Sequence, residues 1–267
     1  MNSNTGKLFF DREFALVDSS GTALRLCQYP KMTSIKPYID IERMTLEVSA
    51  PGQPKLFVDL GLASASPMKD IKVCGDRCEG KLWGSPAVSD WFTTYLNVQC
   101  WLARSDEGNV SLPREIDEEQ THGRHTKRTG FENEAPLLLL SKTSIDILNE
   151  VLEKQGSQLV NSRYFRPNLV VAAEKNCDYS NPEDQWTSVK FPESDIELSV
   201  TGQCARCSMV DIDPESGMKG KTLRALAEYR RNRGQITFGI FLRTTSATRR
   251  RGDREVWVET GELLNVI

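Results

Sequence analysis

The feature that most constrains the fold is a series of short extended runs separated by turn residues. Between Phe9 and Leu60, runs such as MTLEVSA and KLFVDL alternate with the turn sequences DSSG (18–21) and PGQP (51–54). Glycine, proline and aspartate at this spacing are typical of tight turns between strands. The sequence therefore predicts an antiparallel β meander that includes TALRLCQYP (22–30). Because the chain opens directly in strand-like sequence, this lobe is expected to lack its first strand or strands.

Helical periodicity first appears after Ser85-Pro86, an N-cap residue followed by a residue suited to the first helical turn. Apolar residues then recur at helical spacing, which predicts a helix over 86–96 that ends at Asn97. Two more helices are predicted, one from Ser144 to Gly156 and one over 222–231. Further strands are predicted at 99–103, 135–141, 168–173, 186–191, 196–201 and 236–242.

The stretch from Arg104 to Glu134 is polar and charged, with scattered glycines. Loops of this length commonly separate lobes or carry function. We therefore predict an α+β, mostly β protein in three parts: an N-terminal lobe (1–104), a polar linker or excursion (105–134) and a second domain (135–267).

Net charge and composition exclude several classes of protein. The net charge is −3, so no global attraction to nucleic acid or anionic membranes is expected. The basic clusters at 124–128 and 249–254 lack interleaved aromatic residues and are predicted to be solvated loops, with binding of an anionic ligand or partner as the alternative. His122 and His125 are predicted to be exposed and idle, with metal binding as the alternative. No secretory signal or membrane span is apparent, which predicts a cytoplasmic protein.

Seven cysteines in a cytoplasmic chain are expected to be reduced thiols: Cys27, Cys74, Cys78, Cys100, Cys177, Cys204 and Cys207. Several interpretations stay open for the two closely spaced pairs, 74/78 and 204/207. The four cysteines could form a four-thiolate zinc site. Alternatively, Cys204 and Cys207 could carry out thiol–disulfide exchange. Such motifs normally lie at a helix N-terminus, however, and the SMVDID segment that follows them is expected to be extended. They could be buried structural thiols. Alternatively, Cys207 could be one exposed thiolate, favoured by the adjacent Arg206 and suited to a thiophilic metal.

Groups that could bind an anion occur at predicted strand ends. Pro167 is expected to hold Arg166 extended, and the amide of Asn168 can donate and accept hydrogen bonds. Ser141 and Ser144 stand at a predicted helix start, where free N–H groups and hydroxyls could cradle a phosphate. Arg12 is a further candidate. Each also has an ordinary structural role available, so it is their combination with a soft ligand that suggests a site.

Four segments in order along the chain resemble the MOSC domain: LLLLSKTSIDILN, FRPNLVV, CARCSMVDIDPESG and LRALAEYRR with the later FGIFL. The upstream DREFALVDSSGTALRLCQYPKM resembles the MOSC N-terminal β-barrel region. This module is shared by the C-terminal part of eukaryotic molybdenum cofactor sulfurases and by mitochondrial amidoxime-reducing enzymes. The segments KVCGDRC and WGSPAVSDWFTTYL are more similar to the fungal-type sulfurase branch.

The resemblance implies a MOSC-type β-barrel with a few peripheral helices, packed on the N-terminal β lobe. It implies binding of molybdenum cofactor, a phosphorylated pterin whose dithiolene holds molybdenum, and participation in sulfuration of that cofactor. Cys207 matches the family cysteine that ligates molybdenum in the reducing branch, and so is the expected catalytic and metal-facing residue. The expected cofactor-binding residues are Arg12, Ser141, Ser144, Arg166, Asn168 and Arg206.

The resemblance also implies partners. These are a molybdoenzyme that accepts the cofactor or an aminotransferase-like sulfur donor, because nothing in this chain resembles the pyridoxal-phosphate half of a sulfurase. No pyridoxal phosphate site is therefore expected here. Two alternatives remain: a molybdenum-cofactor-dependent reductase of N-hydroxylated compounds, and a cofactor-free or zinc-binding scaffold domain.

Overall fold

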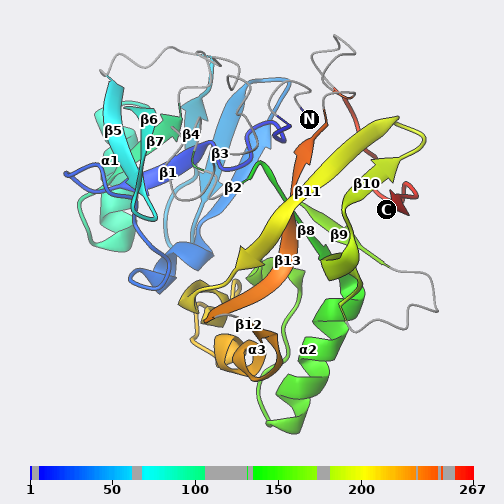
Figure 1. Ribbon diagram of the computed structural model, residues 1–267. Coiled ribbons are helices and arrows are strands. Elements are labelled where there is room, and N and C mark those ends of the chain that lie inside the picture. The colour runs from blue at the N-terminus through cyan, green and yellow to red at the C-terminus, as the bar shows by residue number, and fades with distance from the viewer. Residues whose placement is uncertain are drawn as a thin grey trace. The chain divides into compact units, whose positions relative to one another are not determined.

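The computed structural model of the 267-residue chain describes residues 1, 6–61, 68–105, 131, 135–172, 181–232, 234–245, 248 and 256–267. Figure 1 follows the elements from the N-terminus in blue to the C-terminus in red. The chain divides into two compact units. The N-terminal unit comprises Phe10–Asn133 and Glu215–Gly217, and the C-terminal unit comprises Met1–Phe9, Glu134–Pro214 and Met218–Ile267.

Several sequence features lie outside the described residues. They are most of the polar segment 105–134, with its two histidines and its basic cluster, the basic cluster at 249–254, and Cys177.

The N-terminal unit contains two antiparallel sheets. Its strands are β1 (Phe14–Val17), β2 (Lys36–Asp40), β3 (Thr45–Ser49), β4 (Leu56–Asp59), β5 (Met68–Val73), β6 (Asp76–Leu82) and β7 (Trp101–Ser105). One sheet has the order β1-β7-β6-β5 and the other the order β2-β3-β4. Helix α1 (Pro86–Leu96) packs between apolar residues of both sheets, because its inner face buries Val88, Trp91 and Phe92 in the same cluster as Leu46 of β3 and Leu102 of β7.

The predicted helix over 86–96 is confirmed, including its end at Asn97, which adopts a left-handed conformation. The predicted strand over 22–30 is wrong. Isolated bridges join Thr22 to Lys72 of β5 and Ala23 to Val17 of β1. The chain then turns, with the amide of Tyr29 donating to the carbonyl of Arg25. A tertiary contact stabilises the turn: the Lys31 amine donates to the Tyr95 carbonyl of α1 at 2.6 Å and lies 4.2 Å from the centre of that tyrosine ring.

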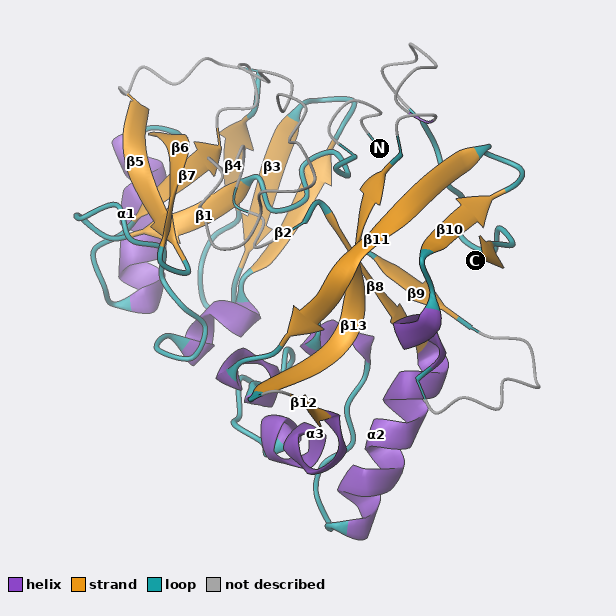
Figure 2. Cartoon of the chain, viewed as in Figure 1, coloured by secondary structure: helices purple, strands orange, loops and turns teal. Residues whose placement is uncertain are grey.

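The C-terminal unit is built on one larger sheet with the order β14-β10-β11-β13-β8-β9, and β12 pairs with β13 (Figure 2). The β8–β9 pair is parallel and the other pairs are antiparallel. The strands are β8 (Leu137–Ser141), β9 (Leu169–Val171), β10 (Ser188–Phe191), β11 (Ile196–Ala205), β12 (Arg231–Asn232), β13 (Gln235–Thr244) and β14 (Asn265–Val266).

Helices α2 (Lys142–Lys154) and α3 (Thr222–Arg230) contact each other and pack against the sheet. Leu148 of α2 and Leu226 of α3 are fully buried with Phe238 of β13. Burying a side chain of this size contributes roughly 1.5–3 kcal/mol, so this cluster anchors both helices. Both helices were predicted, one from Ser144 to Gly156 and one over 222–231, and both are confirmed, with α2 beginning two residues earlier than predicted.

Strands β11 and β13 are each ten residues long and form the centre of the sheet. Gly239 of β13 has a φ of 83°, and a Cβ atom there would lie 2.8 Å from the Leu139 carbonyl of β8. Only glycine therefore lets β13 approach β8 so closely. The described residues are richer in strand than in helix, as an α+β, mostly β fold requires.

Within the described part of the chain, no helix has both the length and the apolar character needed to span a bilayer.

Candidate functional site

The two cysteines of the CARC sequence lie in different environments. Cys204, near the end of β11, is 6% exposed and packs with Leu138 and Phe241. Cys207, two residues after β11 ends, is exposed. The pair is thus divided between the core and the surface, and Cys207 is the thiol available to a ligand.

The expectation that SMVDID is extended is wrong. Residues Ser208–Asp211 form a 3-10 turn that begins directly after Cys207, with the Val210 amide donating to the Cys207 carbonyl at 3.2 Å. The turn forms because Val210 is buried against the α2–α3 cluster and the Asp211 carboxylate accepts the Leu223 amide of α3 at 2.7 Å. These tertiary contacts override the extended preference of the sequence.

Arg206 joins three separate segments of the C-terminal unit. Its backbone amide donates to the Ile236 carbonyl of β13 at 2.7 Å, and its Nε donates to the Phe238 carbonyl at 2.8 Å. Its Nη1 donates to the Phe165 carbonyl at 3.1 Å, and the guanidinium lies 5.5 Å from the centre of the Phe165 ring. The residue next to Cys207 therefore fixes the end of β11 to the loop that carries Arg166.

That loop, Ser162–Asn168, is held at its far end by Asn168. The Asn168 backbone amide donates to the Leu138 carbonyl at 2.8 Å, and the side-chain Oδ1 of Asn168 accepts a hydrogen bond from the Leu138 backbone amide at 2.9 Å. In the middle of the loop the ring of Phe165, which is 2% exposed, packs 4.7 Å from the ring of Phe238. Asn168 therefore extends the β8–β9 pairing, and its predicted contact with a cofactor stays a prediction.

Arg166 is exposed and has a φ of 54°, so the expectation that Pro167 holds it extended is wrong. The preceding residues form a 3-10 turn, and the Arg166 amide continues the turn by donating to the Arg163 carbonyl at 3.3 Å. A left-handed residue commonly ends such a turn, but a non-glycine residue pays roughly 1–2 kcal/mol for it. Residues held in this way cluster at functional sites.

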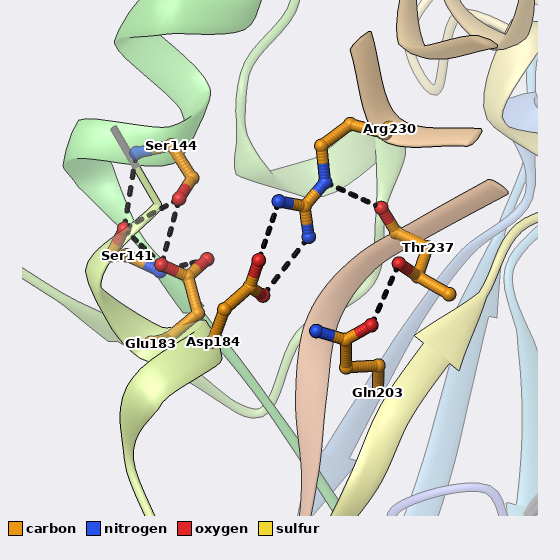
Figure 3. Close-up of polar contacts among 7 residues, drawn as sticks. All are labelled: Ser141, Ser144, Glu183, Asp184, Gln203, Arg230 and Thr237. Carbon is orange, nitrogen blue, oxygen red and sulfur yellow. Dashed lines mark hydrogen bonds and ion pairs between the residues drawn. The ribbon is translucent and has the colours of Figure 1, made fainter. Parts of the chain in front are cut away.

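The predicted phosphate cradle at the start of α2 contains a carboxylate of the protein (Figure 3). Glu183 is 1% exposed and accepts the Ser141 and Ser144 hydroxyls, each at 2.7 Å. The Ser144 amide donates to the Ser141 hydroxyl at 3.0 Å, as in an N-cap. A phosphate contact by these serines stays a prediction, and it would require Glu183 to leave.

Ser141 also stands apart from Asn168 along the sheet. Asn168 pairs with Leu138, whereas Ser141 is three residues further along β8. At about 3.3 Å per strand residue, the two positions are separated by about 10 Å. The structure thus brings Cys207, Arg206 and the Arg166 loop together but leaves the serines with a separate network.

That network continues through the residue after Glu183 (Figure 3). Asp184 receives two hydrogen bonds from the Arg230 guanidinium of α3, at 2.5 and 2.9 Å, and Arg230 Nε donates to the Thr237 carbonyl of β13. The Thr237 hydroxyl in turn donates to Gln203 of β11 at 3.0 Å. Sequence inspection missed Glu183 and Asp184, because a short NPEDQ turn has no periodicity that indicates burial.

Arg12, the remaining predicted ligand, belongs to the N-terminal unit. Like Arg166, Arg12 has a left-handed backbone conformation, with a φ of 52°. Its guanidinium pairs with the Asp11 carboxylate. The next residue, Glu13, is buried and accepts Arg104 Nε at 2.6 Å. The contact of Arg12 with a cofactor stays a prediction.

The other cysteine pair shows the same division as CARC. Cys74 is exposed on the β5–β6 turn, and Cys78 of β6 is 2% exposed beside Ile71 and Ala103. Among the residues that the structure describes, no group of three or more His, Cys, Asp or Glu side chains is arranged to hold a metal ion. No described contact therefore favours a structural zinc site.

Comparison with known proteins places these features in a family. The MOSC domain matches residues 126–263, and the MOSC N-terminal beta barrel domain matches residues 2–99. A solution structure of a protein from Bordetella bronchiseptica matches at 16% identity over 35% of this chain and 71% of that one, with a TM-score of 0.30, and supports no argument.

Two curated relatives are molybdenum cofactor sulfurases. The protein from Arabidopsis thaliana is 31% identical over 97% of this chain and 32% of its own length. The protein from Aspergillus terreus is 30% identical over 87% of this chain and 34% of its own length. The chain thus spans about a third of the length of these relatives. With a matched domain over more than half of its residues, the chain belongs to the MOSC domain family.

Proposed function

We propose that this chain binds molybdenum cofactor and takes part in its sulfuration. The observation that carries the proposal is the arrangement at the end of β11: an exposed Cys207 thiol follows Arg206, whose guanidinium anchors the loop bearing the exposed Arg166. The names of the curated relatives support the same assignment, because the relatives that match most of this chain are molybdenum cofactor sulfurases.

The chemistry of these side chains fits the proposed ligand. A thiolate is a soft donor that suits a thiophilic metal. A guanidinium can bind a phosphate through two parallel hydrogen bonds. Arg166 is exposed, and its backbone amide donates to the Arg163 carbonyl. When bound, the cofactor supplies a molybdenum centre on a phosphorylated pterin.

The roles of the chain's own residues follow from their contacts. Cys207 is proposed to face the metal and Arg166 to hold the phosphate. Arg206 is committed to the carbonyls of Phe165 and Phe238, so its proposed role is to fix the distance between the thiol and the loop. Asn168 is proposed to hold the loop from its other end through its two contacts with Leu138.

Sulfuration requires a sulfur source. We propose an aminotransferase-like pyridoxal-phosphate protein or domain as the donor and a molybdoenzyme as the acceptor of the finished cofactor. Reduction of N-hydroxylated compounds would use the same binding site, so an assay for amidoxime turnover in the presence of an electron-donating partner separates the two activities.

The test compares two cysteine variants of the full chain. Cys207→Ser should abolish retention of molybdenum, because the hydroxyl is a poor ligand for a soft metal. Cys27→Ser, at another exposed cysteine, should retain molybdenum at the wild-type level. Molybdenum per chain is measured by elemental analysis after incubation with the cofactor and desalting, and circular dichroism verifies the fold of both variants.

Equal molybdenum in Cys207→Ser and Cys27→Ser would contradict the proposed role of Cys207. Zinc at one atom per chain, with no molybdenum retained by the wild-type protein, would contradict the proposed function as a whole.

A further inference from the structure

A second connection joins the two segments that Arg206 ties together. Gln158, just before the Ser162–Asn168 loop, donates from Nε2 to Asp213 Oδ2 at 2.9 Å. The same nitrogen lies 3.3 Å from the Tyr164 hydroxyl oxygen. The negative charge of Asp213 helps to raise the pKa of the Tyr164 hydroxyl, after the larger effect of burial. Gln158 thus links the Tyr164 hydroxyl of one segment to the buried Asp213 carboxylate of the other.

Each partner is close in sequence to a residue of the proposed site. Tyr164 precedes Arg166 by two residues, and Asp213 follows Cys207 by six. Asp213 is 8% exposed, and its backbone is fixed by its amide, which donates to the Met218 carbonyl at 2.9 Å. Neither residue is needed to complete the sheet.

Two contacts constrain two segments more than one contact does. The Arg206–Phe165 hydrogen bond joins the loop to the segment that carries Cys207, and Asn168 and Phe165 hold the loop to the sheet. The Gln158–Tyr164–Asp213 cluster adds a second side-chain connection between the loop region and the segment that follows Cys207. Ligand-binding side chains depend on such supporting hydrogen bonds to stay in a productive geometry.

We propose that Tyr164 and Asp213 are positioning residues that set the separation between the Cys207 thiol and the Arg166 guanidinium, and thereby the fit of a metal-bearing, phosphorylated ligand. This inference rests on the proposed function for the identity of the ligand. The Gln158–Tyr164–Asp213 cluster, called the clamp below, belongs to the chain itself. Its effect on Cys207 can therefore be measured without the ligand.

The experiment uses the full chain with Tyr164→Phe and Asp213→Asn. Tyr229→Phe is the matched control, because it removes a hydroxyl in the same unit, on α3. The first measurement is the rate of alkylation of Cys207 by anionic iodoacetate divided by the rate with neutral iodoacetamide. It is made without cofactor, at low ionic strength and fixed pH, and resolved by mass spectrometry of the peptide that contains Cys207.

In the wild-type protein a nearby guanidinium should favour the anionic reagent, so this ratio should exceed the ratio at Cys27. Tyr164→Phe and Asp213→Asn should lower it toward the Cys27 value, and Tyr229→Phe should leave it unchanged. The second measurement is the Kd for molybdenum cofactor, which should rise about 10-fold in both clamp variants and stay constant in the control.

A purely structural role would lower the melting temperature of the clamp variants without changing the alkylation ratio, and that result would overturn the proposal. If Asp213→Asn does not fold, the alkylation ratio and the Kd of Tyr164→Phe test the proposal, because that variant lacks only one hydroxyl group. A wild-type protein that fails to bind cofactor but shows the expected ratios would refute the proposed function and leave the clamp intact.

Discussion

At the scale of single residues, the candidate site depends on backbone conformation as much as on side-chain type. Arg166 and Arg12, the two arginines predicted to meet an anion, both adopt left-handed conformations that disfavour side chains with a Cβ. Selection for stability alone would favour glycine at such positions. The proposed phosphate contact of Arg166 gives a reason for a side chain at this position.

Replacement of Arg166 separates these two effects. In Arg166→Gly the relieved strain and the greater freedom of the unfolded chain should nearly cancel, leaving the free energy of unfolding within about 1 kcal/mol of the wild-type value. Arg166→Gln keeps the strain and a side chain of similar length. Both variants lose the charge, so both should weaken cofactor binding about equally in a titration. Wild-type affinity in Arg166→Gly would show that the guanidinium is not a ligand.

Tyr164 gives a prediction for pH. Burial, followed by the charge of Asp213 and a hydrogen bond to it, raises the pKa of Tyr164 from 10.0 to about 12. Between these values the unfolded chain releases a proton that the folded protein keeps, so the free energy of unfolding falls as the pH rises. Tyr164→Phe should show a shallower fall in urea unfolding across this alkaline range, and below it the two curves should run parallel. Identical slopes across the whole range would contradict the buried contact with Asp213.

At the scale of elements, the start of α2 shows how the hydrogen-bond donors of a helix N-terminus find acceptors within the protein. Its first turn receives the Glu183 carboxylate, which complements both the serine hydroxyls and the positive end of the helix dipole. Asp184 beside it is paired with Arg230, so the two adjacent acids have different partners. The short turn Pro182–Gln185 therefore links α2 to α3 through side chains.

Glu183→Gln should destabilise the C-terminal unit by about 1–3 kcal/mol, because the amide presents a donor where the structure requires an acceptor. The control is Glu193→Gln, at an exposed glutamate between β10 and β11, which should change stability by less than about 0.5 kcal/mol. Urea unfolding monitored by circular dichroism measures both. If Glu183→Gln is as stable as the control, the carboxylate does not hold the helix start.

Elements with strong local signals could be predicted from the sequence, and those fixed by distant contacts could not. The helix at 86–96 has an N-cap, a proline, helical spacing and an asparagine end, and it forms over those residues. The 22–30 segment lacks such signals. It forms a turn that is stabilised by the contact of Lys31 with Tyr95 of α1. Likewise, CARCSMVDIDPESG contains both Cys207 and Asp213, but nothing in its spacing indicates that Tyr164 would reach Asp213 from another loop.

At the scale of the whole molecule, the central sheet of the C-terminal unit provides a rigid base for the proposed site. Strands β11 and β13 pair along most of their length, and Arg206 and Cys207 follow directly where β11 ends. Loops set on such a base can hold ligands in a defined geometry. The proposed function is therefore located at one end of this sheet, and the contact predicted for Arg12 of the N-terminal unit stays a separate prediction.

The most direct test of this account is X-ray absorption at the molybdenum K-edge of the chain loaded with cofactor. The wild-type protein should show one more sulfur ligand at molybdenum than the same cofactor free in solution, and Cys27→Ser should match the wild type. A molybdenum–sulfur shell in the wild-type protein that is indistinguishable from that of the free cofactor would contradict the claim that the Cys207 thiol faces the metal.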